Sequence, residues 1–120
     1  MQLYIYSFIS ACITVILLFI LITVISQAVK LAISNMEKET DILCNQFNEI
    51  VDYVHTYESK EAARAILLYL NAVDSRVNSL LIKANYSEVS KKRYSKSLKK
   101  LNTLKKHIDK THEYIMTEKL

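Results

Sequence analysis

The chain has 120 residues, no glycine and no proline, and carries a formal net charge of +4. Because tight turns with positive φ, phosphate-binding loops and hairpins depend on glycine, this composition argues against a β-rich fold and favours long helices with short connections. The two cysteines, Cys12 and Cys44, lie too far apart to form a bridge within one chain, which excludes a disulfide scaffold.

The first stretch of the chain is apolar on every helical face. No charged side chain occurs from Leu3 to Val29, and the first charge is Lys30. About twenty apolar residues rising ~1.5 Å each cross a hydrocarbon core of ~30 Å, so we predict a transmembrane helix over residues 1–29. A secretory signal peptide is the alternative, because Ser26-Gln27-Ala28 offers a cleavage site, but a basic n-region is missing and the apolar run is too long.

The charges beside the predicted span suggest its orientation. Lys30 and Lys38 follow the span, whereas no basic side chain precedes it. By the positive-inside rule, we expect residues 30–120 to be cytoplasmic.

Apolar residues continue beyond the span at alternating spacings of three and four. This heptad pattern predicts a helix over residues 30–57 that prolongs the transmembrane helix as one rod. Thr40 is the one polar member of the pattern. The apolar seam, which we expect to pack in a bundle or an oligomer, consists of Val29, Ile33, Met36, Leu43, Phe47, Ile50 and Val54.

Two further amphipathic helices are expected over residues 60–84 and 87–118. Ser59 is the predicted N-cap of the first, and Asn85 with Glu88 would form a capping box for the second. The inward candidates of the last helix are Tyr94, Leu98, Leu101, Leu104 or Lys105, Ile108 and Ile115. Because the connections are short, we predict an all-α fold in which the membrane helix leads into an antiparallel three-helix bundle over residues 30–120.

Acidic and basic residues are segregated along the chain. Seven acids stand against three lysines between Gln27 and Glu61, whereas Lys91 to Lys110 holds nine basic residues and one acid. The candidate contact residues are Lys91, Lys92, Arg93, Lys96, Lys99 and Lys100. They suit anionic lipid headgroups or an acidic protein partner. The plainer interpretation is pairing with the acidic first helix. Nucleic acid is disfavoured because no base-stacking platform accompanies the charge.

Residues able to carry catalysis are sparse. His107 and His112 are five apart and do not share a helix face, and Met116 stands where a zincin motif starting at His112 would need its second histidine. The predicted inward positions are aliphatic. We therefore expect no catalytic, cofactor or metal site, and no enzyme.

The function predicted from these patterns is that of a single-pass, membrane-anchored helical assembly protein. It would be a non-catalytic subunit of a membrane complex or a homo-oligomer, with the membrane and other protein subunits as partners. Two alternatives remain open. One is a small accessory membrane protein of a virus, phage or plasmid, acting in exclusion, immunity or lysis control. The other is a sensory or signalling stalk that acts through a partner.

Overall fold

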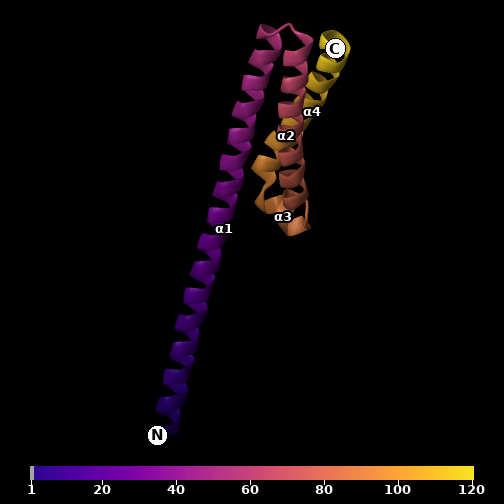
Figure 1. Ribbon diagram of the computed structural model, residues 1–120. Helices are drawn as coiled ribbons and strands as arrows, with labels where there is room; N and C mark the ends of the chain where they lie inside the picture. The colour runs from indigo at the N-terminus through magenta and orange to yellow at the C-terminus, as the bar shows by residue number, and fades with distance from the viewer. Residues whose placement is uncertain (1) are drawn as a thin grey trace. The chain divides into compact units, whose positions relative to one another are not determined.

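The computed structural model describes residues 2–120, which contain helices and no strand (Figure 1). The elements are α1 (Gln2–Thr56), α2 (Lys60–Ala84), α3 (Glu88–Arg93), α4 (Ser95–Tyr114) and a closing π-helical turn (Ile115–Lys119). The all-α prediction is therefore confirmed. The chain divides into an N-terminal unit, Met1–Ser34, and a C-terminal unit, Asn35–Leu120.

From Leu3 to Ile25, the N-terminal unit is a helix whose apolar side chains are exposed on all sides. Among the large apolar residues of this stretch, the exposed fraction runs from 47% at Ile9 to 84% at Leu3. Thr14 and Thr23 donate their hydroxyls to the carbonyl oxygens of Ser10 and Phe19, each at 2.9 Å. These bonds satisfy both hydroxyls within the helix, so neither needs water.

The C-terminal unit is a helical bundle formed by the second half of α1 together with α2 and α4. The backbones of α2 and α4 approach most closely. Glu39 of α1 pairs with Arg76 of α2, and Asp41 of α1 pairs with Lys100 of α4. A second contact on each helix gives its direction. Tyr57, just after α1, lies beside Ala62 of α2, so residue numbers fall along α2 as they rise along α1, and the two helices are antiparallel. His55 of α1 lies beside Tyr114 of α4, so residue numbers rise together and these two helices are parallel.

Each bundle helix buries one row of side chains spaced alternately three and four residues apart, which is one face of a helix. The row of α1 contains Met36, Thr40, Leu43, Phe47, Ile50 and Val54; that of α2 contains Ala63, Ile66, Leu70, Val73, Val77, Leu80 and Ala84; that of α4 contains Ser97, Leu101, Leu104 and Ile108. Together these rows form the hydrophobic core.

The starts of α2 and α3 follow local capping chemistry, with one correction to the sequence prediction. The Ser59 hydroxyl accepts a hydrogen bond from the Ala62 amide at 3.1 Å, which confirms Ser59 as the N-cap of α2. The prediction that Asn85 caps the next helix is wrong. Asn85 ends α2 instead, donating its side-chain amide to the Leu81 carbonyl at 2.9 Å, and Ser87 is the N-cap of α3. An asparagine one residue past a helix can serve its C-terminus, and here a serine stands closer to the new helix.

The last helical segment is broken at Tyr94, where the sequence pattern suggested one helix over residues 87–118. Tyr94 has φ −104° and ψ 22°, so its backbone leaves the helical region between α3 and α4. Its side chain is buried, and the core register then continues at Ser97. Leu98, predicted to point inward, is only half-buried. The buried positions from Tyr94 to Ile108 are spaced three, four, three and four residues apart, and this spacing places Ser97 rather than Leu98 in the buried row.

Candidate functional site

The predicted basic residues separate into paired and unpaired groups. Lys91 pairs with Glu88 at 3.2 Å, and Lys100 pairs with Asp41 at 3.3 Å. Within residues 2–120, no ion pair engages the remaining four, which are Lys92, Arg93, Lys96 and Lys99. Of the six predicted contact residues, Lys100 is therefore the one that pairs with the acidic first helix.

The unpaired lysines continue along α4 beyond the predicted run. Lys106 and Lys110 are exposed, form no ion pair with any described residue, and lie on the same helix face as Lys96 and Lys99. We call these four the lysine row. It extends over the fifteen residues from Lys96 to Lys110, a rise of about 21 Å. The sequence prediction did not include Lys106 and Lys110. Their spacing from the inward-facing Leu101 places both on the outer face of the helix, so the sequence could have identified them.

Lys105 lies on the other side of α4, against α2. Its ammonium contacts the Asp74 carboxylate at 2.5 Å and the Asp109 carboxylate at 3.5 Å. The hydrogen bond to Asp74 raises the pKa of Lys105 above its ordinary value, with smaller contributions from the charges of both acids, while desolvation opposes the shift. This ion pair holds α4 against α2 and removes Lys105 from any outward-facing site.

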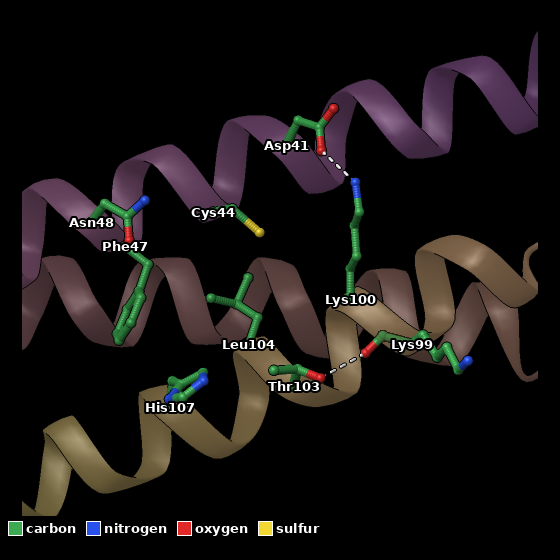
Figure 2. Close-up of a pocket in the computed structure, with 9 residues that line it drawn as sticks. All are labelled: Asp41, Cys44, Phe47, Asn48, Lys99, Lys100, Thr103, Leu104 and His107. Atoms are coloured by element: carbon green, nitrogen blue, oxygen red, sulfur yellow. Dashed lines mark hydrogen bonds and ion pairs between the residues drawn. The ribbon is translucent and has the colours of Figure 1, made fainter.

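An open groove of about 780 Å³ lies between α1 and α4 (Figure 2). Cys44 and Phe47 project into it from α1, while Leu104 and His107 border it from α4. The rings of Phe47 and His107 are stacked, with centroids 6.5 Å apart and planes inclined by 29°. The ion pair between Asp41 and Lys100 closes one end. The surface inside is mainly apolar.

A second, separate hollow lies further along the same two helices. It measures about 240 Å³ and is lined by Val51, Val54 and His55 of α1 and by Lys110 and Tyr114 of α4. We call the two hollows together the α1/α4 groove. Its length along α1, from Asp41 to His55, is about 21 Å, or four helical turns.

Cys44 is half-buried within the groove. Burial raises the pKa of the Cys44 thiol, the nearby Asp41 charge raises it further, and Lys100 partly offsets the increase. The thiol is therefore held in its neutral form and packs as a small apolar side chain.

The predicted seam lies in both units of the chain. Val29 and Ile33, in the N-terminal unit, are half-buried, whereas Met36, Leu43, Phe47, Ile50 and Val54 are buried in the bundle core. Thr40 is also fully buried and donates its hydroxyl to the Met36 carbonyl oxygen at 2.7 Å. Its polar atom is thus satisfied by its own helix.

Metal-binding chemistry is not assembled in the described part of the chain. Residues 2–120 contain no group of three histidine, cysteine, aspartate or glutamate side chains close enough to share an ion. His55 instead lies beside Tyr114, with ring centroids 6.5 Å apart, and His107 stacks on Phe47.

Comparison with known proteins adds no family to this description. No protein-family model, no curated protein and no solved structure matches the chain.

Proposed function

We propose that this protein is a single-pass, membrane-anchored assembly protein that binds other proteins through its helical bundle and performs no catalysis. One observation carries the proposal: the apolar side chains from Leu3 to Ile25 are exposed around the whole circumference of the helix. A surface of this kind is stable in hydrocarbon and costly in water.

The composition of the span supports insertion. Between Leu3 and Ile25 there are fifteen leucine, isoleucine, valine and phenylalanine residues and no charge. At about −0.3 to −0.6 kcal/mol each, they favour insertion by roughly 5–9 kcal/mol if all counted as central. The polar atoms of Thr14 and Thr23 are satisfied within the helix. The residues of this helix therefore suit a bilayer.

α2 also has the length and composition of a membrane span, so the single-pass proposal depends on its packing. Seven of its side chains are buried in the bundle core. It also carries Asp74, which pairs with Lys105, and Arg76, which pairs with Glu39. A charged helix whose apolar face is already covered gains little from lipid, which supports assigning α2 to the water-soluble bundle.

The orientation proposed from flanking charge is cytoplasmic for the bundle, because Lys30 and Lys38 follow the span. Partners proposed for the bundle are other protein subunits, including a second copy, and anionic lipid headgroups near its lysines. Membrane anchoring would raise the local concentration of a partner in the same membrane, which suits a protein without an enclosed pocket.

Extraction at alkaline pH tests the anchor. We expect the full-length protein to stay in the membrane pellet after sodium carbonate treatment. The double substitution Leu17→Arg with Ile20→Arg should release it, because each arginine costs about 3 kcal/mol or more at the helix centre. The matched control is Leu68→Arg with Ile82→Arg, which places the same charges at exposed positions of α2 and should leave the protein in the pellet. Release of the wild-type protein by carbonate would refute the anchor.

A further inference from the structure

The α1/α4 groove combines an apolar floor with one charged side. Phe47, Leu104 and Val54 border it, although all three belong to the core and expose no more than 8% of their surface. Among the residues that line the groove, the one acid, Asp41, is already paired with Lys100, whereas Asp52, exposed on α1 one turn beyond Asn48, forms no ion pair with a described residue. The groove therefore has an apolar centre and an unbalanced positive side.

That positive side is the lysine row. Lys99 lines the first hollow and Lys110 the second, while Lys96 and Lys106 continue the same exposed face of α4. None of the four is engaged in an ion pair with a described residue, and like charges repeated along one face repel each other. An anionic occupant beside the row would relieve this repulsion.

From this combination we propose that the α1/α4 groove binds an acidic amphipathic helix of a partner protein. Two mainly apolar hollows spread over about four turns would take apolar side chains from one face of a helix, and acidic residues along the flank of that helix would meet the lysine row. The inference rests on the proposed function, in which the bundle binds other proteins, and it adds the chemistry of the partner.

Two other occupants fit the observations less well. A lipid surface is planar, whereas the apolar floor is recessed between two helices, and the lysine row has Thr103 rather than an apolar side chain at its middle. A second copy docked groove to groove would bring its own lysine row to the contact, so like charges would meet there.

Cys44 provides a direct readout because it lies in the groove. We would use the full-length chain with Cys12→Ser, in nanodiscs of neutral lipid, and measure the rate at which iodoacetamide alkylates Cys44. The probe is a synthetic 21-residue helical peptide with leucine at the a and d positions and glutamate at the flanking positions. The control peptide has the same leucines and lysine in place of every glutamate.

We expect the glutamate peptide to slow alkylation at least about tenfold at saturation, with weaker binding as salt rises, and the lysine peptide to have no effect. Lys99→Glu with Lys110→Glu should weaken peptide binding by about tenfold, as two reversed surface charge contacts would. The matched control, Lys60→Glu with Lys83→Glu, makes the same change in net charge on α2 and should bind like the wild type. Fluorescence anisotropy of the labelled peptide gives the affinities independently of Cys44.

Three results would overturn the inference: equal protection by both peptides, no protection by either, or protection by anionic lipid in place of the glutamate peptide. The last result would assign the surface to a membrane. Failure here is distinguishable from failure of the proposed anchor, because carbonate extraction does not involve the groove.

Discussion

Leu68 and Leu70 of α2 lie two residues apart, and we expect their truncation to alanine to change the stability of the bundle by very different amounts. Leu70 is 0% exposed at the centre of the core, whereas Leu68 is 72% exposed on the opposite side of the helix. Leu70→Ala removes fully buried methyl groups and leaves a cavity, which costs about 2–5 kcal/mol. Leu68→Ala makes the same chemical change at the surface and should cost no more than about 0.5 kcal/mol.

Thermal unfolding of the full chain in mild detergent, followed by circular dichroism at a helix-sensitive wavelength, measures the difference. For a unit of this size, a loss of about 3 kcal/mol corresponds to a midpoint lower by about 12–24 °C. Leu68→Ala should stay within about 4 °C of the wild type. If α2 instead crossed the membrane, both leucines would face lipid or a partner helix and the two variants would behave alike. Equal midpoints would therefore refute both the packing and the single-pass assignment.

Two further predictions concern polar groups in the bundle. Thr40→Val should raise the free energy of unfolding, measured by chemical denaturation, by about 1 kcal/mol. The substitution replaces a buried hydroxyl with a methyl group, and the Met36 carbonyl oxygen keeps its backbone hydrogen bond. A loss of stability would show that the hydroxyl has another role. Lys105, whose pKa is raised mainly by its hydrogen bond to Asp74, stabilises the fold below its ordinary pKa and loses that contribution as pH rises through the raised value. The stability gap between the wild type and Lys105→Met should therefore narrow above about pH 10.5, and a gap that stays constant would contradict this assignment.

Much of the fold follows from sequence periodicity, because a strict three-four spacing of apolar residues leaves little choice of helix face. The buried positions of α1 and α2 illustrate this, including the polar Thr40, which keeps the spacing although its side chain is not apolar. The break at Tyr94 could not be predicted in the same way. No glycine or proline marks it, and the buried Tyr94 keeps the three-four spacing that one continuous helix would also show.

The charged residues were less predictable than the core, because sequence shows how many charges a segment has but not which of them find partners. Lys100 and Lys105 turned out to lie against acids from other helices, while Lys106 and Lys110 extend the unpaired face. The groove was not predictable at all. It depends on the distance between α1 and α4, and periodicity fixes the direction of side chains without fixing how closely two helices approach.

A shallow groove becomes an adequate binding site if the anchor proposal is correct. The α1/α4 groove is open and its charged side is exposed, so its affinity for a single helix in solution should be modest. Two proteins held in one membrane meet at an effective concentration of about 1 mM, and at that concentration a site with a Kd of about 0.1 mM is roughly nine-tenths occupied. Removing the span should therefore reduce binding to a membrane-held partner far more than binding to the soluble glutamate peptide, since only the former gains from confinement. This difference links the two proposals while leaving each open to its own test.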